Sequence, residues 1–213
     1  MPILDDEALV LDHYPLGDRH LILAVLTRRS GTQRGVLRNA RGGKAPAAAA
    51  AQILSLVRVS LYQRPHADLA TFRHLDLVRS SYPLAADLRG SAASAVVAEL
   101  LLTYCPPAEP EERFFRLGAA ALDGLLADAD PDLVVAYTEF WVLALGGVLP
   151  APDETASAIG KTGFNFLGVC RNAPIGNIHV PVPARVAGWL DRRVRDEAER
   201  PLRALDFFRR HTE

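Results

Sequence analysis

The segment ILSLVRVSLY at residues 53–62 decides the fold class of the first third of the chain. Every second side chain from Val57 to Leu61 is apolar, which is the pattern of a strand with one face on a core. The opposite face carries Arg58 and Tyr62, which are polar enough to contact solvent or a ligand. The segment therefore predicts a strand that packs on one side and can bind on the other.

Four further short apolar runs surround this segment and are separated by turn residues such as Gly, Pro and Ser. The five predicted strands are Leu9–Leu11, Leu21–Leu26, Val36–Leu37, Ile53–Leu61 and Leu69–Val78. An open sheet of this size would expose both of its edges, and all the connections are short. The pattern therefore predicts a small closed β-barrel within residues 1–80.

From residue 83 onward the apolar spacing becomes helical. Helices are predicted from Leu84 to Leu100, from Phe114 to Leu125, from Asp130/Pro131 to Gly146/Gly147, and from Ala184 to a break at Pro201. Three adjacent helices imply a bundle, whereas residues 148–183 are rich in Gly, Pro and small polar residues and predict an irregular segment. The predicted fold class is α+β, with a barrel domain at 1–80 and a helical domain at 81–213.

Charge is unevenly distributed along the chain. No Asp or Glu occurs between Asp18 and Asp68, a stretch that is rich in Arg. Residues 1–80 hold 11 basic and 7 acidic side chains, while the rest hold 13 and 18, within a net charge of -1 for the whole chain. The basic stretch favours a polyanionic partner, and the alternative is that its arginines only decorate solvated strand faces.

Several classes of protein are disfavoured by the sequence. The apolar runs are too short to span a bilayer and the first residues are acidic, which predicts a cytoplasmic location. Cys105 and Cys170 form no CxxC pair, so neither a disulfide framework nor a complete cysteine zinc site is expected. The string Gly42-Gly43-Lys44 lacks the other residues of a phosphate-binding loop, and no nucleophile is paired with a base. We therefore expect no enzymatic activity and no cofactor.

Longer strings carry a resemblance to the RecO family of recombination mediators over nearly the whole chain. These strings are Gly17–Arg19, Val25–Arg28, GTQRGVLRNARGGK at 31–44, EFWVLALGGVLP at 139–150 and the final segment 195–210. Asn39 stands where the family pattern has Gly, and Asn is the side chain that best replaces Gly at positive φ. Their order and spacing together are fairly specific.

The resemblance implies an OB-type barrel followed by a helical domain, and a protein that acts without catalysis in DNA repair and homologous recombination. Family members bind single- and double-stranded DNA, anneal complementary strands and act with RecR to load RecA onto DNA coated by single-stranded-DNA-binding protein. They also bind the acidic C-terminal tail of that coating protein, which calls for an apolar pocket rimmed by Arg. The implied location is cytoplasmic and nucleoid-associated.

Many members of the family carry a four-cysteine zinc module after the third helix. The corresponding positions here are Ala156, Ile159, Cys170 and Ala173, so three of the four ligands are missing. A lone thiolate cannot hold structural zinc. We therefore predict a metal-free segment in which residues 148–183 form an irregular insert.

Candidate DNA contacts follow from the basic stretch together with the resemblance. The leading candidates are Arg34, Arg38, Arg41 and Lys44, followed by Arg28, Arg58 and Tyr62. Guanidinium groups bind phosphate, and Tyr62 could stack on a base more readily than Tyr14 or Phe72, of which Phe72 is expected in the core. The arginines of the last helices are interleaved with acids and predict a solvated face. A protein-interaction adaptor and an RNA-binding barrel protein remain as alternatives.

Overall fold

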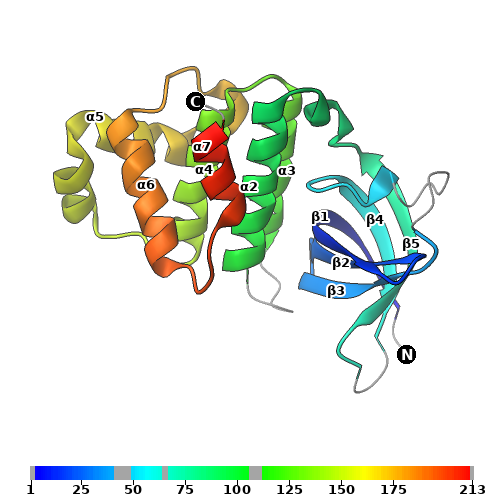
Figure 1. Cartoon of the computed structure of the whole chain (residues 1–213). Coiled ribbons are helices and arrows are strands. Elements are labelled where there is room, and N and C mark those ends of the chain that lie inside the picture. Colours follow the sequence, from blue (N-terminus) through cyan, green and yellow to red (C-terminus); the bar gives the residue numbers. More distant parts are fainter. Residues whose placement is uncertain (1–2, 41–48, 64–66, 106–111, 212–213) are drawn as a thin grey trace.

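A computed structural model of the chain describes residues 3–40, 49–63, 67–105 and 112–211 (Figure 1). Its first part is a closed barrel with the strand order β1-β2-β3-β5-β4. The strands are β1 (Leu4–Leu16), β2 (His20–Thr27), β3 (Gly31–Leu37), β4 (Leu56–Tyr62) and β5 (Ala70–Arg79). Each observed strand overlaps a predicted strand, so the predicted five-stranded barrel is confirmed. The strand β1 is much longer than the predicted strand Leu9–Leu11.

The barrel is filled by the apolar side chains that alternate along its strands. Its interior includes Val10, Leu23, Val25, Val57, Val59, Leu61 and Phe72. A Cβ on Gly35 of β3 would lie 2.8 Å from the carbonyl oxygen of Ala70 and 2.9 Å from the Phe72 ring. The parallel pairing of β3 with β5 therefore depends on a glycine, because any side chain would push the two strands apart.

Helices make up the second part of the chain. They are η1 (Tyr82–Ala86), α2 (Leu88–Tyr104), α3 (Glu112–Leu126), α4 (Pro131–Leu145), α5 (Pro152–Asn172), η2 (Ile175–Asn177), α6 (Ala184–Glu197) and α7 (Arg203–His211). Asp130 caps α4 by accepting a hydrogen bond from the backbone N of Asp132 at 3.1 Å, with Pro131 in the first turn. The predicted bundle is confirmed, and Pro201 lies in the connection between α6 and α7 as expected.

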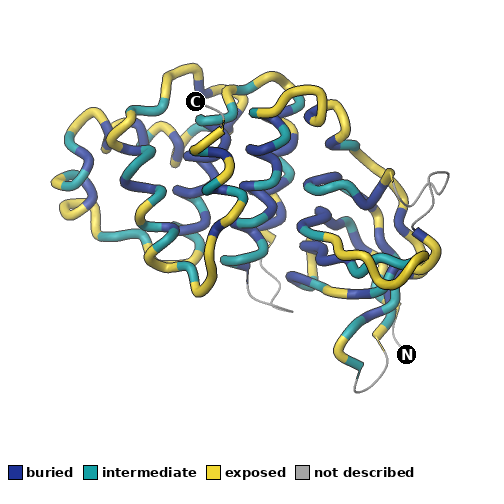
Figure 2. The backbone as a smooth tube through the Cα atoms, viewed as in Figure 1, coloured by how far each residue is buried: buried dark blue, intermediate teal, exposed yellow. Residues whose placement is uncertain are grey.

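The prediction that residues 148–183 form an irregular segment is wrong, because α5 occupies most of it. Pro152 begins this helix, where its missing N–H costs nothing, and the chain changes direction at Gly160, whose φ is +74°. Ile159, Phe166 and Cys170 are buried at helical spacing. Figure 2 shows α5 at the end of the bundle with one buried and one exposed face. The sequence did not predict this helix because its small residues and glycines give only a weak apolar periodicity.

The barrel and the helices share one hydrophobic core. Leu9 and Leu11 point out of the barrel on β1 and join Leu26 of β2 in the core of the helical region. In Figure 1, α2 and α3 stand between the barrel and the remaining helices. The hydroxyl groups of Ser55 and Ser81 hydrogen bond at 2.9 Å across the same junction. This shared packing fixes the outward surface of the barrel relative to the bundle.

Candidate nucleic-acid interface

Arg34 and Arg38 lie at β3 and directly after it. Both side chains are exposed, and neither forms an ion pair with a carboxylate in the described part of the chain. Arg34 borders a cleft of about 730 Å³ between the barrel and the C-terminal ends of α2, α4 and α6. Two guanidinium groups are thus available to a phosphate backbone. The other two leading candidates, Arg41 and Lys44, lie outside the described residues.

The turn that follows Arg38 has the backbone conformation that the sequence predicted. Asn39 adopts a φ of +54°, in the left-handed region. Its backbone N–H donates to Nδ1 of His20 at 3.1 Å, which ties this turn to the start of β2. The path of the chain immediately after Arg38 is therefore anchored to the barrel.

Arg28 is engaged in structure rather than free for a ligand. Its Nε donates to Glu112 at the start of α3 at 2.9 Å, and its Nη1 donates to Glu7 on β1 at 3.2 Å. The hydrogen bond that Arg28 donates to Glu112 is the main cause that raises the pKa of Arg28. The guanidinium also lies 5.9 Å from the ring centre of Phe115. Arg28 thus links the barrel to the bundle.

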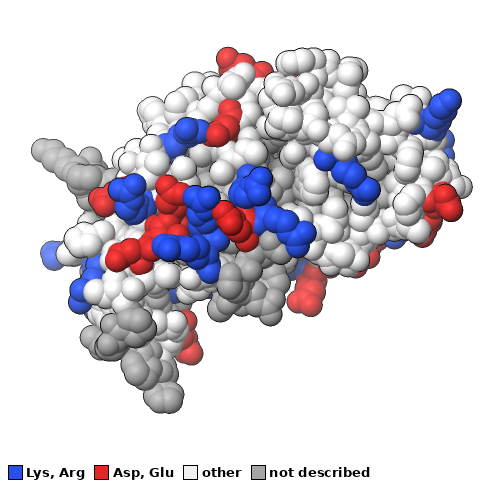
Figure 3. Space-filling view, turned by 180° about the vertical axis from the view of Figure 1, so that it is seen from behind, with Lys and Arg blue, Asp and Glu red and all other residues white. Residues whose placement is uncertain are grey.

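Arg58 lies among acidic side chains that are distant in sequence. In the strand register it stands opposite Glu7 on β1 and Asp76 on β5. It lines a hollow of about 530 Å³ together with Asp5, Asp6, Glu7, Arg28 and Arg29. From behind, basic and acidic side chains are interspersed over the barrel and its junction, while the helical region is largely uncharged on this face (Figure 3). The acid-free stretch is therefore partly neutralised by the first strand.

The aromatic candidates are placed differently from one another. Phe72 is 3% exposed in the barrel core, as predicted. Tyr62 is half-buried, and the guanidinium of Arg73 lies 5.0 Å from its ring centre, so one face of the ring is already covered. Tyr14, which the sequence argument ranked lower, is 51% exposed.

Arg200 lies between α6 and α7 and is one of the arginines for which the sequence predicted a solvated face rather than a place at the site. Its Nε and Nη2 lie 3.2 and 3.1 Å from Oγ1 of Thr103, and it borders the same cleft as Arg34. Tyr14 lies close enough to Arg200 and Arg34 to feel their charges. Its pKa is raised overall, mainly by its hydrogen bond to Asp12, and the two arginines only reduce this rise. The available sequence signal was that Arg200 directly precedes Pro201, the proline expected to interrupt the last helical segment. Because Asp68, Glu197 and Glu199 also line the cleft, it is mixed in charge rather than basic.

The four positions that hold zinc in many RecO proteins lie on α5 and at its C-terminal cap. Ile159 and Cys170 are buried in the helical core, and burial raises the pKa of the Cys170 thiol to about 12. Across the described ranges, no cluster of three or more His, Cys, Asp or Glu side chains is arranged to hold a metal ion. Ile159 and Cys170 thus contribute to the packing of the helical core. No helix in the described ranges is long and apolar enough to cross a membrane.

Comparisons with known proteins agree with this architecture. The family model described as "Recombination protein O N terminal" matches residues 1–81, which contain the barrel. The model described as "Recombination protein O C terminal" matches residues 85–179. The chain belongs to the RecO family.

A curated member of the RecO family supports the same assignment. It is the "DNA repair protein RecO" of Koribacter versatilis (strain Ellin345), which is 30% identical over 144 residues. The alignment covers 68% of this chain and 59% of the relative. The relative's name describes a DNA repair protein, and this chain spans less than two thirds of that relative's length.

Proposed function

We propose that the chain is a recombination mediator that binds single- and double-stranded DNA and anneals complementary strands. With RecR, it helps to load RecA onto DNA that is coated with single-stranded-DNA-binding protein. In this proposal residues 1–80 bind nucleic acid, and residues 81–213 position the barrel and bind protein partners. No step of this activity makes or breaks a covalent bond, so no catalytic group is needed.

The observation that carries the proposal is the pair of exposed arginines at β3, Arg34 and Arg38. Two DNA strands repel each other through their phosphates, and cations that bind both backbones screen this repulsion. If Arg34, Arg38, Arg41 and Lys44 each neutralise one phosphate, the affinity falls with salt with a log–log slope of roughly -3 to -4. Backbone contacts of this kind carry little sequence preference.

The test is annealing of two complementary oligonucleotides coated with single-stranded-DNA-binding protein, followed by fluorescence over a salt series. The intact chain should accelerate annealing, and Arg34→Glu/Arg38→Glu should lose both the acceleration and the DNA binding. The matched control is Lys161→Glu/Arg192→Glu, which makes the same change of charge at exposed positions on α5 and α6. Equal loss in both double variants would assign the effect to net charge and overturn the role of β3.

Two other functions predict different outcomes in the same experiment. An interaction adaptor would keep its protein partner and its cellular role after Arg34→Glu/Arg38→Glu. An RNA-binding barrel protein would prefer RNA over DNA of the same sequence at matched salt. Annealing by the intact chain that the β3 variant loses, without an RNA preference, supports the mediator.

For the acidic tail of single-stranded-DNA-binding protein, we propose a groove between α3 and α4. The groove measures about 390 Å³, and its lining combines two arginines with apolar side chains: Arg113, Arg116, Leu117, Ala120, Tyr137, Trp141, Leu145 and Pro174. An apolar floor with a basic rim is the kind of pocket that the resemblance implies for this acidic tail. The charge complementarity of Arg113 and Arg116 supports this choice.

Binding of a fluorescent tail peptide tests the groove separately from DNA binding. Arg116 is exposed, so Arg116→Glu should weaken the peptide at least tenfold without unfolding the helix. Lys161→Glu should leave the affinity unchanged. Unaltered binding of the peptide by Arg116→Glu would mean that the tail binds elsewhere on the protein. This outcome would not affect the conclusion drawn from the annealing experiment.

A further inference from the structure

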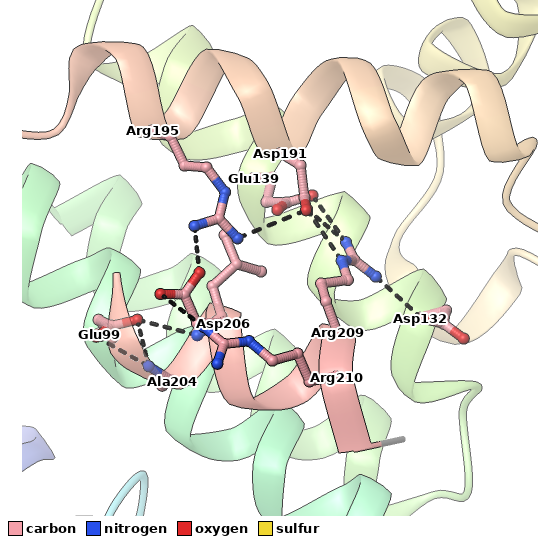
Figure 4. Close-up of polar contacts among 10 residues, drawn as sticks. Glu99, Asp132, Glu139, Asp191, Arg195, Ala204, Asp206, Arg209 and Arg210 are labelled. Carbon is pink, nitrogen blue, oxygen red and sulfur yellow. Dashed lines mark hydrogen bonds and ion pairs between the residues drawn. The ribbon is translucent and has the colours of Figure 1, made fainter. Parts of the chain in front are cut away.

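One arginine of the last helix, α7, contacts two other elements, and Arg195 of α6 donates to Asp206 of α7 beside it (Figure 4). Nε and Nη2 of Arg209 donate to Oδ1 of Asp191 on α6 at 3.0 and 2.8 Å. Nη1 donates to Oδ1 of Asp132 on α4 at 3.1 Å. The charged end of α7 is therefore clamped between α4 and α6.

A third carboxyl group lies behind this clamp. Glu139 on α4 is completely buried, and its Oε2 lies 3.6 Å from Nη2 of Arg209. Neither of its oxygens has a hydrogen-bond partner among the described residues. One guanidinium already bonded to Asp191 and Asp132 cannot also satisfy a buried charge on Glu139.

The groups around Glu139 come from four helices. Asp191 and Arg195 of α6, Arg209 of α7 and Tyr104 of α2 interact electrostatically with Glu139 itself. The next charged groups pair with these residues or with each other: Asp132 of α4 and Asp206 of α7 bind the same arginines, Arg89 of α2 pairs with Asp132, and Arg210 of α7 pairs with Asp206. Burial, and then the neighbouring Asp191, raise the pKa of Glu139 well above its ordinary value. Arg209 and Arg195 act in the opposite direction but do not reverse it.

The other end of α7 is held by a different carboxylate. Oε2 of Glu99 on α2 accepts hydrogen bonds from the backbone N of Ala204 at 3.0 Å and of Leu205 at 3.2 Å. Phe208 is fully buried between these two polar contacts. The nine-residue helix is thus fixed at its start by a cap and at its end by the Arg209 clamp.

We propose that α7 is a proton-dependent latch, which is closed while Glu139 is neutral and loosens when Glu139 ionises beside Asp191 and Asp132. A neutral Glu139 leaves Arg209 to the two aspartates. Arg89 also pairs with Asp132, and Arg195 also pairs with Asp191, but among the described residues Arg209 alone lies within ion-pair distance of Glu139. An ionised Glu139 therefore adds a buried negative charge that competes with the two aspartates for Arg209, which weakens the docking of α7. The proposal does not depend on DNA binding.

The direction of the pH effect follows from linkage. The carboxyl of Glu139 is harder to ionise in the docked state than in the released chain. Its contribution to docking is complete at acidic pH, below the ordinary carboxyl pKa, and is lost as the pH rises through the raised value. Replacing Glu139 by Gln keeps the shape and removes the charge.

Hydrogen exchange of the α7 backbone in the full chain tests the latch, with rates corrected for intrinsic exchange from mildly acidic to alkaline pH. The wild type should lose protection in α7 at least tenfold over this range relative to Glu139→Gln, whose protection should stay level. Glu154→Gln, which removes an exposed carboxylate paired with Arg193, should behave as the wild type. Equal curves for the wild type and Glu139→Gln would overturn the proposal.

A second measurement keeps the proposal testable if Glu139→Gln does not fold. The carboxyl carbon of Glu139 can be followed by NMR in the wild type as the pH is raised, together with amide signals of α7. Ionisation of Glu139 and weakening of α7 should share one midpoint above the ordinary carboxyl range. Ionisation at an ordinary pH, or without any change in α7, would overturn the latch.

Discussion

The arginines of β3 and those of α7 show two uses of the same side chain in one molecule. Arg34 and Arg38 are exposed and have no carboxylate partner among the described residues, so their charge is available to a ligand. The side chain of Arg209 is only 22% exposed and lies within ion-pair distance of three carboxylates on two helices. A guanidinium that is already satisfied holds the fold together, and one that is not can recruit a partner. Burial and neighbours, rather than the local density of arginine, separate the two roles.

Removing the Arg209 contacts on α7 should have the largest effect on stability. Arg209→Ala removes the guanidinium that donates to Asp191 and Asp132, and loss of one partner of a partly buried ion pair costs roughly 3 kcal/mol. Urea denaturation followed by circular dichroism should show this loss in the free energy of unfolding. Arg210→Ala is the neighbouring control, because Arg210 is 72% exposed and its ion pair with Asp206 is long, at 3.9 Å. Similar losses of unfolding free energy in both variants would mean that the contacts of Arg209 stabilise the fold no more than an exposed ion pair does.

Salt should separate the two regions next. Contacts between exposed arginines and phosphates release counterions, so a fivefold rise in salt should weaken DNA binding by roughly 100- to 600-fold if four phosphates are neutralised. The buried contacts of Arg209 are screened much less, and the free energy of unfolding should change by less than about 0.5 kcal/mol over the same range. Fluorescence anisotropy with labelled DNA and urea denaturation measure the two quantities. A salt-insensitive DNA complex would contradict a phosphate-binding role for β3.

Much of the fold could be predicted from the sequence because its signals are local. The alternation from Val57 to Leu61 marked β4, and the cap at Asp130 marked the start of α4. The exception is α5, where glycines and small residues suggested a loop, while the burial of Ile159 and Cys170 depends on helices that are distant in sequence. Local patterns therefore identified the elements that carry strong apolar periodicity.

The site was less predictable, because a charge acts through its neighbours in space. Arg28 and Arg58 looked free in an acid-free stretch, but β1 brings Glu7 next to both through its pairing with β4 and β2. In the same way, the mixed charges of the last helices suggested a solvated face with pairs inside one helix. The structure contains such pairs, between Arg195 and Asp191 and between Arg210 and Asp206. Shorter contacts run between helices, from Arg195 of α6 to Asp206 of α7 and from Arg209 of α7 to Asp191 of α6. Only the pairing of strands and helices reveals these contacts.

Single substitutions in the barrel should distinguish an arginine that is available to DNA from one that is already paired with carboxylates. Arg34→Ala removes one phosphate contact, so the log–log slope for single-stranded DNA should become shallower by about 0.7. Arg28→Ala removes a side chain that Glu7 and Glu112 already engage, so the slope should stay the same. Anisotropy titrations at four or five salt concentrations resolve the difference. Equal slope changes would show that Arg28 leaves its carboxylates to bind DNA.

The smallest effect is expected at Arg58, which tests whether exposure alone makes an arginine a DNA contact. Arg58 and Arg34 are both exposed, but Arg58 stands opposite Glu7 and Asp76 in the barrel. A phosphate approaching Arg58 would also approach these carboxylates, whose repulsion offsets the attraction at such short range. Arg58→Ala should therefore change DNA affinity by less than about twofold, a difference of roughly 0.4 kcal/mol. A loss as large as that of Arg34→Ala would mean that DNA displaces the acidic neighbours, and the binding surface would then extend around the barrel from β3 to β4.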